Sequence, residues 1–316
     1  MPFSGYVLIP AFVLAAALVL DRCLGDPHTP FHPVALIGRV IGWWGRPSVY
    51  RPGIQRLAGI ICWAGTSLLF TLPFLLVEWF APWWLYLLAG PFLLKSTFAW
   101  RSLEEHASSV EAGLATDPGA GRTAASMMVS RNTETLSDEE VRSAAYESVA
   151  ENLVDSILAP LFWFAILGLP GAALYRAANT MDAMLGYRDE RERLGWFPAR
   201  ADDLLSYIPA RIAGCLLLCW FGVYGRGRDA FSILRRDARK RPGPNGGIPM
   251  AAIAGGCGIA FTKPGGYLIG EPARSLLKGG SCVIAAVRGV TLFFAFLLLL
   301  IWILPGLSLI SPLLWG

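Results

Sequence analysis

The chain has 316 residues, of which 54% are hydrophobic and only 16% are charged, with a formal net charge of +4. Soluble domains average about 25% charged residues, so this composition disfavours an ordinary soluble globule. It excludes a disordered chain, a fibre and a small disulfide-bonded scaffold. The apolar residues gather into blocks that approach or reach the roughly 20 residues needed to cross a bilayer, which predicts a membrane protein.

Six apolar blocks follow one another along the chain, at residues 6–20, 57–77, 83–99, 153–175, 208–224 and 290–310. The fourth block is interrupted by Pro160 and by the run Gly168-Leu169-Pro170-Gly171. Such a break favours partial insertion, because irregular backbone is tolerated at membrane depth only where protein or water shields it. A Gly-rich apolar stretch at 247–261 is expected to be re-entrant or buried in protein. We therefore expect an all-α polytopic membrane protein with about five or six membrane segments, forming a single membrane-embedded domain over residues 1–316.

The basic residues predict an orientation. Residues 21–56 hold five arginines against two aspartates, and residues 226–288 hold eleven Lys and Arg against three acids. Both stretches are expected on the cytoplasmic side of a cell membrane, together with the site. Residues 100–152 then form a helical insertion that faces solvent, while 176–204 and 226–288 form polar loops that carry site motifs. Whether the blocks at 153–175 and 208–224 cross the membrane completely is left open.

A helix that a capping box opens at Ser137 and Glu140 carries three acids on one face. Glu147, Glu151 and Asp155 lie at positions i, i+4 and i+8. Like charges at this spacing cost about 0.2–0.5 kcal/mol per pair, and the helix runs toward an apolar block. The acids therefore need compensation, either from a divalent cation or from arginines in a structural ion-pair network.

Two further polar stretches are candidates for a site. The first combines Asn, Asp and Arg without Lys, at Asn179, Asp182, Arg200, Asp202, Asp203 and Arg211. Arginine suits bidentate binding of phosphate or carboxylate, although a solvated loop of self-cancelling charge is the alternative. The second is a basic run at 235–241 followed by a Pro/Gly/Asn turn at 242–247. The run is most simply a juxtamembrane patch that faces anionic lipid, and the turn offers backbone N–H groups to an anion.

The cysteines and histidines give little support for a metal centre. There is no Cys-x-x-Cys pair, and Cys215 and Cys219 are expected to be small buried hydrophobic residues of one helix face. His28 and His32 lie in a proline-rich segment, where a metal pair is only a weak hypothesis.

Five motifs along the chain resemble those of one family. They are Asp21-Arg22 with Gly25-Asp26-Pro27 and His32-Pro33-Val34; Glu147 to Asp155 with Ala159-Pro160-Leu161-Phe162; Asn179-Thr180-Met181-Asp182 through Gly186-Tyr187; Ala199-Arg200-Ala201-Asp202-Asp203 with Pro209-Ala210-Arg211; and Pro244-Asn245-Gly246-Gly247. In order and spacing they resemble the CobD/CbiB family of cobalamin-biosynthesis membrane proteins over residues 15–275. Two positions depart from the family pattern, where Asn132 replaces an aspartate and Gly243 replaces a serine.

The resemblance implies an enzyme, adenosylcobinamide-phosphate synthase, which is an ATP-dependent acid–amine ligase. It joins a propionate carboxylate of adenosylcobyric acid to aminopropanol or its phosphate, and it implies ATP and Mg²⁺ as cofactors and a corrinoid as substrate. The implied partners are the lipid bilayer and other membrane proteins of the cobalamin pathway, and no nucleic acid is expected. The alternatives are a non-catalytic membrane sensor of the same family and a small-molecule transporter. Against the first stand the acid clusters, and against the second the absence of an internal repeat in the sequence.

The resemblance also implies roles for individual residues. The metal ligands are expected at Glu147, Glu151 and Asp155, and the catalytic groups at Glu151, Asp202 and Asp203. Substrate or phosphate binding is expected at Arg131, Thr133, Asn152, Asn179, Asp182, Arg200, Arg211 and Asn245.

Overall fold

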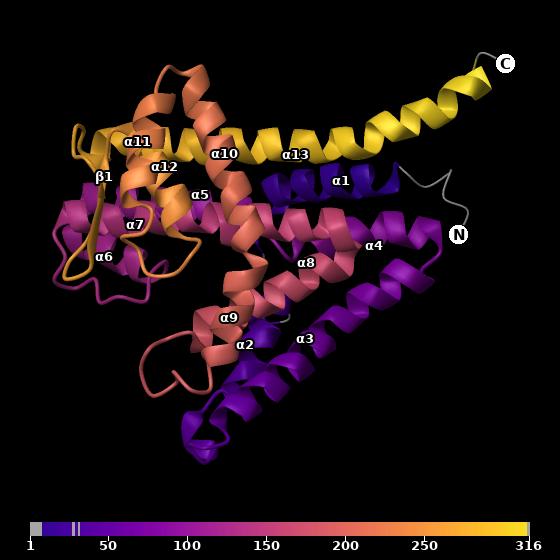
Figure 1. Ribbon diagram of the computed structural model, residues 1–316, viewed down its shortest axis with the longest axis horizontal. Coiled ribbons are helices and arrows are strands. Elements are labelled where there is room, and N and C mark those ends of the chain that lie inside the picture. The colour runs from indigo at the N-terminus through magenta and orange to yellow at the C-terminus, as the bar shows by residue number, and fades with distance from the viewer. Residues whose placement is uncertain (1–7, 27–28, 31, 315–316) are drawn as a thin grey trace. The chain divides into compact units, whose positions relative to one another are not determined.

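The computed structural model describes residues 8–26, 29–30 and 32–314, and they form helices joined by short connections (Figure 1). The chain divides into two compact units made of non-contiguous segments, where the sequence suggested a single domain. The first unit comprises Met1–Ala99, Ala159–Leu205 and Ala295–Gly316, and the second comprises Trp100–Leu158 and Ser206–Phe294. The division arises because the helices of each unit pack on partners that are distant along the chain.

The first unit is built from helices that pack in pairs. Its elements are α1 (Ile9–Leu24), α2 (Pro33–Trp44), the short 3-10 turn η1 (Pro47–Val49), α3 (Gln55–Phe80), α4 (Trp83–Lys95), α8 (Ala159–Leu185) and α9 (Trp196–Leu205). Helix α1 packs on α4, while α8 contacts α2, α3, α4 and α9.

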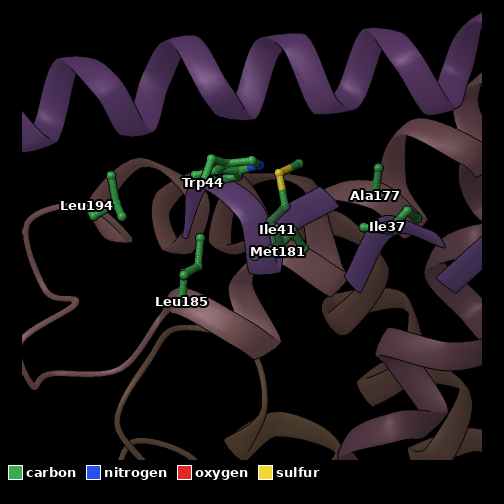
Figure 2. Packing of buried hydrophobic residues seen from close by; sticks show 7 residues of the cluster. All are labelled: Ile37, Ile41, Trp44, Ala177, Met181, Leu185 and Leu194. Atoms are coloured by element: carbon green, nitrogen blue, oxygen red, sulfur yellow. The ribbon is translucent and has the colours of Figure 1, made fainter. Parts of the chain in front are cut away.

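One hydrophobic cluster of this unit joins α2 to α8 (Figure 2). Its members are Ile37, Ile41 and Trp44 of α2, Ala177, Met181 and Leu185 of α8, and Leu194, all at most 4% exposed. Both helices present these residues at helical spacing, so each contributes one apolar face. The indole Nε1 of Trp44 donates to Thr66 Oγ1 of α3 at 3.1 Å, which satisfies the polar end of a ring buried among apolar side chains.

The second unit carries helices and one short hairpin. Its elements are α5 (Trp100–Thr116), α6 (Pro118–Ser126), α7 (Asp138–Leu153), the π-helical turn η2 (Val154–Leu158), α10 (Tyr207–Val223), α11 (Gly227–Asp237), α12 (Gly247–Cys257), β1 (Ala260–Lys263), β2 (Tyr267–Gly270) and the first part of α13 (Leu276–Leu314). Helix α7 contacts α5, α6, α12 and β1, and α10, α11 and α12 pack on one another (Figure 1). The strands pair antiparallel, with Thr262 opposite Leu268.

Helical structure over 100–152 is confirmed, and so is the capping box, in which Ser137 Oγ accepts from the Glu140 backbone N–H and the Glu140 carboxylate accepts from the Ser137 N–H. The structure differs at 176–204 and 226–288, which were expected to be polar loops. These stretches hold the end of α8, all of α9, α11 and α12, the hairpin and the start of α13. A high content of charge conceals the periodicity, because α11 buries only Ala230, Ile233 and Asp237.

The all-α polytopic class is confirmed, with one short hairpin added. Within the described residues, three helical segments are long and apolar enough to cross a membrane: Gln55–Phe80, Asp138–Leu185 and Leu276–Pro305. The bent pair Trp196–Leu205 and Tyr207–Val223 would make a fourth. The expected number was about five or six. Helices α1 and α4, expected as spans, have 16 and 13 residues, because Asp21-Arg22 follows the first apolar block and Pro82 opens the third.

The predicted interruption of the fourth block is confirmed at Gly168. This glycine has φ +67° and ψ −157°, so α8 is kinked there. Just beyond the kink, the Leu169 N–H donates to Glu78 Oε2 at 3.0 Å, and Tyr86 donates to the same carboxylate at 3.0 Å. Pro160 acts differently, because the π-helical turn η2 lies directly before it. A proline in a helix removes one N–H and crowds the preceding turn, and the wider π turn accommodates that change.

Candidate functional site

The carboxylate of Glu147 lies at the centre of a polar cluster in the second unit. Its Oε1 accepts from Ser143 Oγ at 2.7 Å, and its Oε2 accepts from the Tyr267 hydroxyl at 2.9 Å. Arg131 Nη2 lies 3.0 Å from the same Oε2. Glu147 is only 5% exposed, so these three donors replace the water that a buried carboxylate has lost.

Tyr267 reaches Glu147 because the hairpin is fixed to α7. The Thr262 N–H of β1 donates to Ser143 Oγ at 2.6 Å. The antiparallel register then brings β2, and Tyr267 with it, beside the same helix. Burial, together with the Glu147 charge, raises the pKa of Tyr267. The phenol therefore stays protonated and donates to Glu147 at neutral pH.

Glu151, one turn further along α7, forms an ion pair with Arg241. The Arg241 Nη1 also donates to the Pro242 carbonyl at 2.8 Å. A Cβ at Gly246 would lie 2.8 Å from the Arg241 guanidinium carbon, so a glycine is needed where the backbone passes this side chain. The basic run was interpreted as a lipid-facing patch, but this member of it turns to the site acid.

Arg211 of α10 joins the turn before α12. Its Nη1 donates to Asn245 Oδ1 at 2.6 Å, and its Nη2 donates to the Pro244 carbonyl at 3.1 Å. Two of the motifs noted in the sequence, at 209–211 and at 244–247, therefore meet within one unit.

Arg131 has one unused donor. Its side chain is 15% exposed, and its Nη1 is buried with no hydrogen-bond partner among the described residues. A buried donor without a partner costs about 1–3 kcal/mol. An anionic oxygen of a ligand would fit this donor, since arginine binds carboxylate and phosphate through paired N–H groups.

The acids of α7 are covered by arginines in the structure. Arg131 and Arg241 pair with Glu147 and Glu151, which are two of the three acids, and Arg142 bonds instead to Glu111 at 3.0 Å. In the part of the chain that the structure describes, no group of three His, Cys, Asp or Glu side chains is placed to hold a metal ion. The metal role of these acids stays a prediction.

The π-helical turn η2 bears on the third acid. Asp155 lies in this turn, and Glu147 and Glu151 lie in α7. A π turn shifts the residues that follow it around the helix axis, which moves Asp155 out of the i, i+4, i+8 alignment. For the histidine pair, His32 Nε2 lies 3.9 Å from Asp26 Oδ1, while His28 is outside the described residues.

Two of the expected substrate-binding residues make structural bonds. Asn152 donates to the Ser148 carbonyl at 2.9 Å and accepts from Ser156 Oγ at 2.7 Å. Thr133 is buried and donates to the Arg122 carbonyl at 2.9 Å. These groups hold the α7 region together, and their expected contact with a substrate is a prediction.

The remaining candidates lie in the first unit, on α8 and α9. The Asn179 side-chain amide donates to Asp202 Oδ1 at 3.2 Å, and Asp202 is 9% exposed. On the outer side of α9, Arg200 and Asp203 lie 3.9 Å apart in a loose ion pair. A Cβ at Gly186 would approach Asp182 Oδ1 to 2.1 Å, so the glycine lets the chain pass close to this acid.

A buried lysine of the first unit was missed in the sequence. Lys95 Nζ lies 3.3 Å from Asp21 Oδ1 and pairs also with Asp26, and Asp21 has no exposed surface. Lys95 was counted as part of an apolar block, although a lone charged residue in such a block is a signal of a functional or buried pair. The acids Asp21 and Asp26 were noted only as motif residues.

The helices and the buried arginine–glutamate cluster define a polytopic helical membrane protein with a polar site. The family model described as CobD/CbiB protein matches residues 14–288, and the chain belongs to this family.

Its relatives carry related names. It is 43% identical to the probable cobalamin biosynthesis protein CobD of Methanothermobacter thermautotrophicus over 84% of this chain and 88% of the relative. It is 38% identical to the cobalamin biosynthesis protein CobD of Dehalococcoides mccartyi, with coverage of 84% and 88%. Family membership supports a role in cobalamin biosynthesis. No solved structure matches the chain significantly.

Proposed function

We propose that this protein catalyses the amide-forming step of cobalamin biosynthesis, as an ATP-dependent adenosylcobinamide-phosphate synthase of the membrane. The propionate carboxylate of adenosylcobyric acid would be joined to the amine of aminopropanol or its phosphate. The observation that carries the proposal is the unused, buried Nη1 of Arg131 beside Glu147, in a chain of the CobD/CbiB family.

The proposed reaction makes three demands on the protein. A carboxylate does not react with an amine at neutral pH, so its oxygen must become a leaving group at the expense of ATP. Negative charge on the transferred oxygens must be balanced, and the attacking amine must lose a proton.

The side chains of both units supply groups of these kinds. Arg131 and Arg211 suit the binding of phosphate or carboxylate oxygens. Glu151, Asp202 and Asp203 are the candidate proton acceptors, and Asn245, which Arg211 orients, is a candidate for binding the amide groups of the corrin rim. Asn179 holds Asp202 through its amide and is a positioning residue in this scheme.

The Mg²⁺ requirement is part of the proposal, although the described residues hold no ready ligand set. We therefore derive no step through the metal. Mg²⁺ keeps several waters and is usually bound by one or two carboxylates together with substrate phosphates. A requirement for it would appear as loss of product on chelation and recovery on addition of Mg²⁺.

The deciding assay uses membranes that contain the protein, with adenosylcobyric acid, Mg-ATP and either aminopropanol or aminopropanol phosphate. We expect an amide product and stoichiometric consumption of ATP with one of the two amines. The absence of both product and ATP turnover would favour a sensor or a transporter instead.

The site assignment is tested in the same assay. We expect Glu151→Ala and Asp202→Ala to abolish product formation while the protein is still inserted in the membrane, and Arg131→Lys to lower it at least tenfold, since lysine cannot bind bidentately. The matched control is Arg193→Lys, a change at an exposed loop position. Near-normal activity of both alanine variants would contradict the assignment.

A further inference from the structure

Helix α11 has two faces of opposite character. Ala230, Ile233 and Asp237 are buried against the second unit. The other face is exposed and forms a stripe that runs past the end of the helix, consisting of Arg228, Phe231, Arg235 and Arg239. Steps of three and four residues align these side chains. We refer to these four residues as the basic stripe.

The arginines of the basic stripe differ from their neighbours in having no acidic partner. Arg236 pairs with Asp237 at 2.8 Å and with Glu271 at 2.5 Å, and Lys240 pairs with Asp237 at 2.7 Å. Among the residues that the structure describes, no acid lies within ion-pair distance of Arg228, Arg235 or Arg239. The positive charge of the stripe is therefore available to an external partner.

The stripe follows directly on the end of an apolar helix. Helix α10 ends with Val223 and Tyr224, which are 84% and 63% exposed, and the rings of Trp220 and Tyr224 lie 5.0 Å apart. Exposed aromatic rings at the end of an apolar helix are typical of the membrane–water interface. Gly225, with φ +72°, turns the chain into α11 within a few residues. Helix α11 thus begins where α10 reaches the interface (Figure 1).

We propose that the basic stripe binds the anionic headgroups of the membrane surface. The charge complementarity is direct, since three arginines without partners would meet a negatively charged leaflet. Phe231, which is 53% exposed in the middle of the stripe, would enter the headgroup region, as the apolar residues of interfacial helices do. This inference does not depend on the proposed enzymatic activity.

The test compares the triple variant Arg228→Gln, Arg235→Gln and Arg239→Gln with a matched control. The control, Arg51→Gln, Arg188→Gln and Arg193→Gln, removes the same charge from exposed arginines of the first unit. Each protein is reconstituted into vesicles of 70% phosphatidylcholine and 30% phosphatidylglycerol. Spin-labelled phosphatidylglycerol and phosphatidylcholine then report the selectivity of the protein for anionic lipid.

We expect the wild-type protein and the control to prefer the anionic lipid, and the triple variant to lose most of that preference. The effect of one arginine near such a surface is about fivefold in association, and it should weaken as salt is raised toward 1 M, where the screening length falls to about 3 Å. As a second measurement, the salt dependence of wild-type selectivity needs no variant that folds.

Three results would overturn the proposal. They are an unchanged preference in the triple variant, an equal loss in the control, and a wild-type selectivity that does not respond to salt. An equal loss in the control would mean that net charge, and not the stripe, attracts the lipid.

Discussion

At the scale of single residues, the buried carboxylates are held by donors that come from distant parts of the chain. Glu147 shares one oxygen between Arg131 and Tyr267, and Asp237 is bonded by Arg236, by Lys240 and by the Gly270 N–H at 2.9 Å. Removing one donor leaves a buried charge with an unmet bond, and such changes are costly.

We expect Tyr267→Phe to lower the free energy of unfolding by about 1.5–3 kcal/mol, because it removes one hydrogen bond to a charged group and keeps the ring. Thermal unfolding in detergent measures the change. Tyr224→Phe is the control, since the Tyr224 hydroxyl makes no hydrogen bond within the described residues. A loss below about 0.5 kcal/mol for Tyr267→Phe would show that the bond to Glu147 is not formed.

Asp237 predicts a response to acid. Burial opposes its charged form, but the bonds from Arg236, Lys240 and the Gly270 N–H prevail and hold the pKa of this carboxyl well below its usual range. The stabilisation is therefore complete above the unfolded-state pKa, near 3.9, and it is lost as the pH falls toward the lower folded-state pKa.

We expect Asp237→Asn to cost about 3–5 kcal/mol at pH 7 and to flatten the loss of stability below about pH 4. Melting curves between pH 3 and 7 measure both effects. Asp229→Asn, at an exposed ion pair, should change stability by at most about 1 kcal/mol. An acid response in Asp237→Asn as steep as that of the wild type would assign it to other carboxylates.

At the scale of elements, the kink in α8 depends on a glycine and on a carboxylate from another helix. Gly168 has positive φ, and a Cβ there would lie 2.8 Å from the Glu78 carboxylate that bonds to the Leu169 N–H. The kink therefore needs both the left-handed backbone and the close approach of Glu78.

We expect Gly168→Ala to lower the free energy of unfolding by about 2 kcal/mol or more, from backbone strain and displacement of Glu78. Gly42→Ala is the control, since Gly42 lies within α2 and nothing lies within 4 Å of its Cβ position. It should be neutral or stabilising by about 0.5–1 kcal/mol. Equal effects of the two changes would show that the kink does not need glycine.

At the scale of the whole molecule, a disulfide joins two elements of the second unit. Cys257, at the end of α12, is bonded to Cys282 of α13 across 25 residues, and Cys23, Cys62, Cys215 and Cys219 are free. The expectation that Cys215 and Cys219 are buried was wrong, because both lie exposed on the surface of α10. The same sequence analysis did not foresee the disulfide, since the two partners lie in separate apolar stretches.

We expect reduction, or the double change Cys257→Ala and Cys282→Ala, to lower stability by about 2–4 kcal/mol. Unfolding in detergent with and without dithiothreitol measures this, and the reductant should have no further effect on the double variant. Replacing the exposed Cys215 and Cys219 by alanine is the control. If reductant leaves wild-type unfolding unchanged, the bond is absent from the folded protein.

The sequence by itself determined the features that depend on neighbours along the chain. The helical class, the start of α7 at its capping box and the break near Gly168 follow from periodicity, caps and glycine, all of which act within a few residues. The motifs likewise identified the family, which the family model then confirmed.

Only the tertiary structure decided which charges meet. Tyr267 is 120 residues from Glu147 and Arg241 is 90 residues from Glu151, and nothing in the local pattern distinguishes these partners from the many other arginines and tyrosines. Lys95 likewise gained its role from Asp21, 74 positions before it in the chain. The physical reason is that a charge in a low-dielectric interior selects its partner by position in space after the helices have packed, and that position is not written in the spacing of any one segment.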